Sequence, residues 1–343
     1  MSRPKSARVT VRDIAAEAGV SIATVSRVLN GGAAVSPATR LTVRQAMERL
    51  GAAVPVPVAR PAGARTGAVF VRCPYLLTDY FGTLVSAVAE ALDRHGRRLI
   101  LNAGDAAKEA RVLAGLPERR DIDGALLVLP VEEAAELAEL RSRDFPFVVV
   151  DPRTPLPRDI AGVSAAHFAG ARSVAAHLAE LGHRRIGLIN GPADWLASSS
   201  RFGGHASALA EAGVLVAPEL VVNVEPTAEE GYRAAGRLLD LADRPTALAA
   251  FNDKTAAGAL RAAHERGLRI PGDLSVAGFD DLYLSRTSVP MLTTVRQPLA
   301  ELGGLAVSLL LRLLDGHTVE ALHVELATEL IVRGSTGPVP QHR

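Results

Sequence analysis

Apolar positions near the start of the chain recur at helical spacing in two short runs, which are separated by a glycine. The first run consists of Val11, Ile14, Ala15 and Ala18, and the second of Val25, Val28 and Leu29. Between the runs, Gly19 permits the tight backbone conformation that ends a helix, and Ser21 is a good N-cap for the next helix. Helices this short are not stable alone, so the pattern predicts that they pack together as a helix-turn-helix.

The outer face of the second helix carries small and hydrogen-bonding side chains, at Ile22, Ala23, Thr24, Ser26, Arg27 and Asn30. Small residues at the leading end of a helix allow it to approach base edges. Arg27 and Asn30 have the groups that hold phosphates or read guanine and adenine. We therefore expect this helix to enter the major groove of DNA. The alternative is an ordinary helical hairpin with a solvated face.

A third helix and a linker follow this pair. Ser36-Pro37, a cap followed by a proline at the first helical position, begins a helix that continues through Leu41, Val43, Ala46, Met47 and Leu50. Residues 51–66 then become rich in Ala, Pro and Gly. The sequence thus predicts a helical DNA-binding domain at 1–50 and a hinge or linker at 51–66.

From Gly67 onward, short apolar runs alternate with stretches of helical periodicity. We expect strands at 67–73, 98–102, 123–129, 146–150, 185–190, 221–224, 246–251 and 274–279. Helices are expected at 82–95, 168–181, 204–212, 229–241 and 254–266, followed by a late helix at 299–314 and a last strand at 328–333. Buried strands that alternate with covering helices predict an α/β body of doubly wound parallel sheets.

The alternation is longer than one sheet needs, which predicts two similar lobes within residues 67–336. We expect one lobe to comprise 67–163 with 297–325 and the other 164–296 with 326–336, before a tail at 337–343. Ligands of open parallel sheets bind at the carboxyl ends of the strands. The cleft between the lobes is therefore the expected ligand site.

Charge is divided unevenly along the chain, although the net charge of the 343 residues is only +1. Residues 1–66 hold ten Lys and Arg against three acidic residues, a balance of +7, whereas the remainder holds 28 basic and 34 acidic residues, a balance of −6. A basic head on an acidic body is the electrostatic pattern of nucleic-acid binding at one end. A merely solubilising surface would not explain why the basic segment coincides with the helix-turn-helix.

Cysteine content and the absence of long apolar runs exclude several classes of protein. Cys73 is the only cysteine, which rules out an intrachain disulfide and a cysteine-cluster metal site and favours a packed thiol. The start of the chain is polar, and no stretch of 18 uncharged apolar residues follows. We therefore expect a cytoplasmic protein without a membrane anchor.

In their order along the chain, these features resemble the lactose-repressor (LacI/GalR) family of bacterial transcription regulators. The resemblance covers about Val9 to Arg333 and rests on the 9–30 stretch with four later motifs: Leu181-Gly-His-Arg-Arg-Ile-Gly187, Asn252-Asp253, Val276-Ala-Gly-Phe-Asp-Asp281, and Leu292-Thr-Thr-Val295 with Gln297-Pro298. Members of that family are dimers or tetramers that bind near-palindromic operators, and a core like that of periplasmic binding proteins senses a small molecule. The resemblance implies a homodimer, double-stranded DNA and a sugar effector as partners, with no cofactor.

The family's operator contacts carry over to the outer face of the second helix, at Ser21, Ile22, Ala23, Thr24, Ser26, Arg27 and Asn30. Ile22 and Ala23 occupy the positions with which the family selects base pairs, and they offer only apolar contacts, for example to thymine methyls. Thr10 and Arg12 resemble phosphate clamps, and Arg60 in the linker is expected to contact DNA.

The linker departs from the family's pattern, Tyr-x-Pro-Asn-x-x-Ala-x-x-Leu, which folds on DNA into a short hinge helix. Val56 stands at the asparagine position and Ala62 at the leucine position. Pro61 has no amide hydrogen and fits only the first turn of a helix. A methyl group is also too small to unstack a base step. We therefore expect neither a fully formed hinge helix nor a strong central kink in the operator.

The family's effector cleft carries over to Arg201, Asn252 and Asp280, with Asp151 and Gln297 as weaker matches. A guanidinium donates in a fixed fork, a carboxylate accepts from paired hydroxyls, and an amide does both. This chemistry suits a sugar.

Three aromatic residues join this predicted site. Trp195 follows a strand and can stack on a pyranose, while Tyr80 and Phe81 resemble a cleft-lining aromatic pair. Some of the residues in and beside this predicted site also have a purely structural alternative to effector binding. Arg201 could form an ion pair at the surface, Asp280 and Asp281 could cap a helix, and Trp195 could pack in the core.

Three classes of function are compatible with an α/β body of this kind. We favour a transcription regulator, a repressor, whose operator affinity is switched by an effector bound between the lobes. An exported sugar-binding transport protein is the alternative, but the sequence shows a basic head and no signal peptide. An enzyme is disfavoured because Gly-x-Ser-x-Gly, Walker and metal-ligand patterns are absent, and His183, His205 and His264 are scattered singly. We therefore expect no catalytic residue and no metal.

Overall fold

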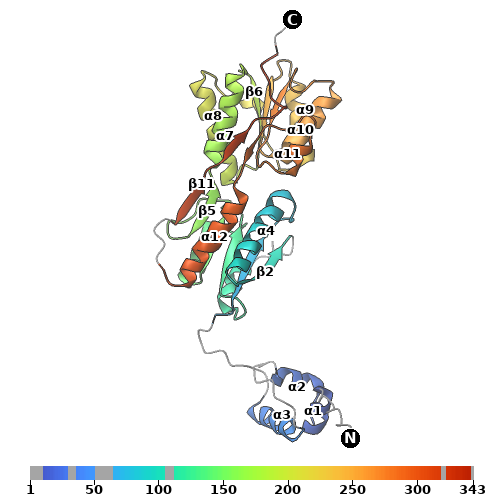
Figure 1. The fold of residues 1–343 in the computed structure, drawn as a ribbon, viewed down its shortest axis with the longest axis vertical. Helices are drawn as coiled ribbons and strands as arrows, with labels where there is room; N and C mark the ends of the chain where they lie inside the picture. Colours follow the sequence, from blue (N-terminus) through green and yellow to red (C-terminus); the bar gives the residue numbers. More distant parts are fainter. Residues whose placement is uncertain (1–10, 30–35, 51–64, 105–111, 318–321, 341–343) are drawn as a thin grey trace, which may run out of the picture. The chain divides into compact units, whose positions relative to one another are not determined.

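The computed structural model describes residues 11–29, 36–50, 65–104, 112–317 and 322–340. The chain separates into two compact units, residues 1–64 and 65–343, which we call the head and the body (Figure 1). Each unit is described by itself. The predicted hinge lies almost wholly outside the described residues, and with it the expectation about a hinge helix.

Three helices form the head: α1 (Val11–Ala18), α2 (Ile22–Leu29) and α3 (Pro37–Arg49). Their shared core consists of Ile14, Ala15, Ala18, Val25, Val43, Ala46 and Met47, with Val20, Val28 and Leu50 at its edge. Gly19 ends α1 with a φ of +62°, and the Val20 N–H returns to the Ala15 carbonyl at 3.1 Å. The predicted helix-turn-helix is confirmed. Leu41, in contrast, lies on the solvent side of α3 and is 58% exposed.

Lobe 1 of the body is built on a six-stranded parallel sheet, in the order β11-β5-β4-β3-β1-β2. The strands are β1 (Ala68–Cys73), β2 (Arg98–Ala103), β3 (Gly124–Val128), β4 (Phe147–Val150), β5 (Gly162–Ala165) and β11 (His323–Leu326). Helices α4 (Asp79–Arg94) and α12 (Leu299–Leu314) cover one face side by side, and α5 (Val112–Gly115) and α6 (Ala134–Ser142) cover the other.

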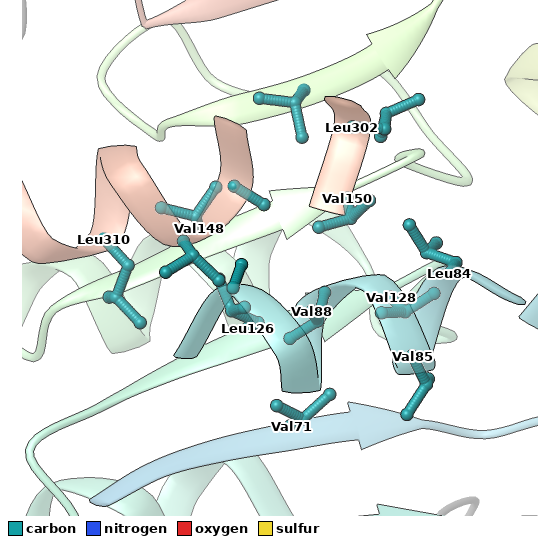
Figure 2. Packing of buried hydrophobic residues seen from close by; sticks show 14 of the residues in the cluster. Val71, Leu84, Val85, Val88, Leu126, Val128, Val148, Val150, Leu302 and Leu310 are labelled. Atoms are coloured by element: carbon teal, nitrogen blue, oxygen red, sulfur yellow. The ribbon is translucent and has the colours of Figure 1, made fainter. Parts of the chain in front are cut away.

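Side chains that alternate along the strands divide the core of lobe 1 between these two faces. Figure 2 shows the face under α4 and α12, where Val88 of α4 lies near the strand residues Leu126 and Val71, and Leu84 lies near Val128. The intervening strand residues face α5 and α6 instead. Both faces are therefore apolar, as a buried parallel sheet requires.

Lobe 2 carries a smaller parallel sheet in the order β7-β6-β8-β9. Its strands are β6 (Ile186–Asn190), β7 (Val221–Asn223), β8 (Ala247–Ala250) and β9 (Ser275–Ala277). Helices α7 (His167–Glu180) and α8 (Leu196–Glu211) cover one face, α9 (Ala228–Leu239) and α10 (Asp253–Glu265) cover the other, and α11 (Tyr283–Thr287) follows β9. A Cβ on Gly204 would lie 2.2 Å from the Phe168 carbonyl oxygen, so α7 and α8 approach this closely only because glycine is there.

Three short segments cross between the lobes: after β5, before α12, and between β11 and β12 (Glu329–Ile331). The predicted last strand exists as β12, but it pairs antiparallel with β10 (Thr294–Arg296) in a separate two-stranded sheet and does not extend the sheet of either lobe. β11 is the late strand that completes lobe 1. The predicted lobe limit after residue 163 falls within β5.

The sequence pattern missed several elements, among them α6, β5 and β11, and it placed the start of α8 eight residues too late. Strand β5 has only four residues and β11 lies at an edge of the sheet, so neither gives a long apolar run. Three serines at 198–200 resemble a loop. In the structure, the Ser199 hydroxyl donates to the Leu196 carbonyl at 2.9 Å, which accommodates a serine inside a helix.

The start of the body is attached to the end of α12. The Arg65 guanidinium pairs with the Asp315 carboxylate and donates a hydrogen bond to the Leu314 carbonyl. The Gly67 N–H donates to the Asp123 carboxylate at 2.7 Å. The chain therefore enters the body at a fixed point beside the carboxyl end of α12.

Candidate DNA-reading helix and effector cavity

Part of the predicted DNA-contacting surface is visible on α2. The Ser21 Oγ accepts from the Thr24 N–H at 3.1 Å, which confirms Ser21 as the N-cap, and the two hydroxyls lie 2.8 Å apart. Ile22 is 49% exposed, so its side chain is available for an apolar contact. Outside the described residues lie Thr10, Asn30 and Arg60, and also the side chains of Arg12, Ala23, Ser26 and Arg27.

A cavity lies between the two lobes at the carboxyl ends of their strands. It contains about 580 Å³ of space free of atoms, part of which is continuous with solvent. The structure brings all eight predicted effector-site side chains into its lining: Tyr80, Phe81, Asp151, Trp195, Arg201, Asn252, Asp280 and Gln297. The lining residues that the sequence did not indicate are Leu129, Ala197, Pro226, Phe251, Lys254 and Leu282.

Aromatic rings pack against one another beside this cavity. The rings of Tyr75 and Phe81 stack with centroids 4.5 Å apart. Trp195, the N-cap residue of α8, meets Tyr75 of lobe 1 edge-on at 6.0 Å and Phe251 of lobe 2 at 6.2 Å. Trp195 therefore packs against both lobes and lines the cavity at the same time.

Arg201, on α8, is the buried cation of the cavity and is only 4% exposed. Its guanidinium lies over the rings of Phe279, at 3.7 Å, and Phe251, at 4.4 Å, and it donates to the Phe251 carbonyl. Burial lowers the pKa of Arg201, and the nearby carboxylates, Asp280 first, oppose that shift. The burial excludes a surface ion pair as its role. Its Nε lacks a hydrogen-bond partner within the described residues.

Asp280 follows β9 and holds the opposite charge. Its Oδ1 lies 3.8 Å from the Arg201 guanidinium and accepts from the Gln297 amide at 2.6 Å, while the Gln297 Oε1 has no partner within the described residues. Burial raises the pKa of Asp280 and also that of Asp253, which the charge of Asp280 raises further. Asp280 does not cap α11, whose N-cap is Leu282.

Asn252 lines the cavity and also caps α10. Its Oδ1 accepts from the Thr255 N–H at 2.9 Å, and the Thr255 hydroxyl accepts from the Asn252 N–H at 3.0 Å. With the oxygen used in this way, the side-chain amide nitrogen is the group of Asn252 that remains for a ligand.

Asp151 follows β4 on the lobe 1 side and accepts two hydrogen bonds. One comes from the Tyr80 hydroxyl, and the other joins its Oδ1 to His167 Nε2 at 2.9 Å. Burial alone would raise the pKa of Asp151, but His167, Tyr80 and the charge of Arg201 together bring it below its usual value. His167 was missed by sequence reasoning because it stands alone, outside every motif.

The backbone at Asp280 is supported by its neighbour Asp281. Both residues have positive φ, 115° and 54°, which is uncommon for residues other than glycine. The Asp281 carboxylate is buried and forms ion pairs with Arg286, Arg296 and Arg333. These three arginines were also missed, since Arg333 is far from Asp281 in sequence and only the fold brings all three to one carboxylate.

A helix-turn-helix head followed by a two-lobed body with a polar and aromatic interlobe cavity defines a class, the ligand-responsive DNA-binding regulators. Comparison with known proteins agrees with this class. Residues 10–51 match the model of bacterial regulatory proteins of the lacI family, and residues 175–336 match that of a periplasmic binding protein-like domain. The HTH-type transcriptional regulator DegA of Bacillus subtilis (strain 168) is 33% identical over 338 residues, covering 97% of this chain and 99% of DegA.

Two solved structures resemble the whole chain. The transcriptional regulator CelR in complex with cellobiose has a TM-score of 0.73 and 31% identity, covering 96% of this chain and 100% of CelR. The lac repressor dimer bound to operator and the anti-inducer ONPF has a TM-score of 0.72 and 28% identity, with the same coverage. This chain belongs to the lacI family of bacterial regulatory proteins, and it combines a DNA-binding head with an effector-binding body.

Within the described ranges, no helix is both long enough and apolar enough to cross a lipid bilayer.

Proposed function

We propose that this protein is a homodimeric, cytoplasmic repressor that binds a near-palindromic operator through α2 and releases it when a sugar enters the interlobe cavity. The proposed operator contacts are Thr10, Arg12, Ser21, Ile22, Ala23, Thr24, Ser26, Arg27, Asn30 and Arg60. The proposed effector contacts are the eight predicted side chains of the cavity lining. No catalytic role is assigned to any of them.

One observation carries this proposal: a buried guanidinium, a buried carboxyl group and a carboxamide meet beside aromatic rings. Arg201 and Gln297 both contact Asp280, and each has a buried polar atom without a partner among the described residues. A hydroxyl group donates and accepts at once, so it can satisfy both an amide oxygen and a guanidinium N–H. A polyol presents several such groups, together with an apolar ring face for Trp195.

The switch follows from the placement of the cavity between two lobes. A sugar that contacts both lobes favours the lobe arrangement in which all its contacts form, and it shifts the population toward that arrangement. In a dimer, this shift changes the relative placement of the two heads, which lowers operator affinity. The coupling is reciprocal, so operator DNA lowers sugar affinity by the same factor.

A thermal-shift screen of the full chain against a sugar panel tests the effector class. The panel begins with cellobiose and its glucose unit, because the CelR structure contains cellobiose. A ligand at 100 times its Kd adds about 2.7 kcal/mol to stability, which raises the melting temperature by several degrees. Asp280→Ala should abolish the shift, and a normal calorimetric titration of this variant would remove Asp280 from the site.

Selection of binding sites from random DNA by the full chain tests the operator half of the proposal. We expect a near-palindrome, and retention on heparin with a steep salt dependence. Arg27→Ala should weaken binding to the selected DNA without changing sugar affinity. Unchanged binding in a gel shift would contradict the assignment of α2 as the reading helix.

A further inference from the structure

His167 connects the two lobes at the cavity without lining it. It is the first residue of α7, it is buried, and it lies at the crossover that follows β5. Its Nε2 lies 2.9 Å from Asp151 Oδ1 on the lobe 1 side, and its Nδ1 lies 3.3 Å from the Arg201 guanidinium in lobe 2. Both partners line the cavity.

These two contacts define the tautomer of the imidazole. A guanidinium can only donate hydrogen bonds, so the His167 Nδ1 that faces Arg201 carries no proton and accepts. The ring proton therefore resides on Nε2 and is donated to the Asp151 carboxylate. The result is a directed chain in which Arg201 donates to His167 and His167 donates to Asp151.

We propose that His167 is a positioning residue that couples the effector-binding side chains of the two lobes, by orienting Arg201 and Asp151 toward each other through its neutral Nε2–H tautomer. This inference deepens the proposed function and rests on it for the identity of the cavity. A movement of one lobe against the other that separates Arg201 from Asp151 would lengthen at least one of these two hydrogen bonds.

Three substitutions separate the two contacts. In His167→Gln, the amide nitrogen occupies the place of Nε2 and can still donate to Asp151. In His167→Asn, the amide oxygen occupies the place of Nδ1 and can still accept from Arg201. His167→Ala removes both contacts, and His264→Ala on the exposed face of α10 is the matched control.

Two measurements on the full chain test the proposal without any effector. Nitrogen-15 NMR of histidine-labelled protein, assigned with His167→Gln, should show the neutral Nε2–H tautomer for His167 at neutral pH. Trp195, the only tryptophan, contacts both lobes and reports their closure through its quenching by acrylamide. Loss of two charge-assisted bonds in His167→Ala should raise the quenching constant by about 1.5-fold or more.

We expect His167→Gln and His167→Asn to fall between the wild type and His167→Ala, and His264→Ala to match the wild type. An Nδ1–H tautomer, or unchanged quenching in all three His167 variants, would overturn the proposal. If His167→Ala does not fold, the quenching constants of His167→Gln and His167→Asn test the proposal instead. Because neither measurement uses a sugar, failure of the sugar screen contradicts the proposed effector while leaving this result intact.

Discussion

Arg201 touches Phe251 twice, since its guanidinium lies 4.4 Å from the centroid of the phenyl ring and also donates a hydrogen bond to the carbonyl of the same residue. Phe251 directly follows β8, so a rigid strand end holds both contacts. The plane of the guanidinium is thereby fixed before any ligand arrives. Such preorganisation reduces the entropy that binding must overcome.

Arg201→Lys should therefore impair effector binding while the charge is retained. A lysine ammonium cannot stack flat on two rings and donate in a fork. We expect at least a tenfold loss of affinity for the sugar found in the screen, about 1.4 kcal/mol, measured by calorimetry. Arg185→Lys, which alters an arginine of lobe 2 remote from the cavity lining, is the control. Equal affinities of the two variants would contradict the role of the guanidinium geometry.

Two exposed ion pairs join the lobes, and their loss should loosen the closed arrangement. Lys254 of lobe 2 lies 2.9 Å from Asp79 of lobe 1, and Arg153 donates to Asp194 at 3.1 Å. Exposed pairs contribute roughly 0–1 kcal/mol each and are screened by salt. The double change Asp79→Asn with Arg153→Met should raise acrylamide quenching of Trp195 at low salt.

In 1 M salt, the double variant and the wild type should have similar quenching constants, because salt screens the attraction between the paired charges in the wild type. Arg185→Met is the control, since it breaks ion pairs that lie within lobe 2. An effect of the control as large as that of the double variant would show that the quenching does not report interlobe pairs.

His205 should make the body sensitive to acid. It is 7% exposed, and burial together with the charge of Arg201 lowers its pKa to about 4. Between about pH 6.5 and 4 the unfolded chain binds a proton at this residue and the folded chain does not, so stability falls as the pH falls. At pH 5 the loss amounts to about 2 kcal/mol.

The measurement is urea unfolding of the wild type and His205→Gln at pH 7 and pH 5. Glutamine does not titrate, so the variant should lose less stability than the wild type across this interval. A wild type and variant with parallel pH dependence would show that His205 is protonated in the folded state.

Val25→Asp should abolish DNA binding and leave the body intact. Val25 is completely buried in the small core of the head, and an unpaired buried charge costs several kcal/mol, as much as such a small domain has to lose. We expect loss of binding to the selected operator DNA in a gel shift, with an unchanged sugar-induced thermal shift. Gln45→Asp, which adds the same charge at an exposed position of α3, should retain most of the binding.

The parts of this molecule that were predictable from sequence are those with local signals. The helix-turn-helix follows from helical spacing around Gly19, and the late helix at 299–314 has the predicted limits. The cavity residues were predicted from the family resemblance. Three of them, Asp151, Asn252 and Asp280, lie shortly after strands, and the carboxyl ends of parallel strands meet at one place.

The parts that were not predictable depend on contacts between distant segments. His167 has no neighbouring motif, and its importance arises only when α8 brings Arg201 to its ring. The arginine cluster around Asp281 joins residues up to 52 positions apart. Strand β11 has only four residues, and its partner β5 lies far earlier in the chain, so their pairing has no signal in the local sequence.

Helix α12 connects the cavity with the point where the chain enters the body. Gln297, which holds Asp280, lies just before its first turn, and Arg65 is bound to its last residues. Sixteen residues span about 24 Å, so a tilt of about 5° at the Gln297 end displaces the far end by about 2 Å. A rearrangement of the hydrogen bond between Gln297 and Asp280 that tilts the helix would therefore displace the far end, where Arg65 is bound, by a larger distance than the rearrangement itself.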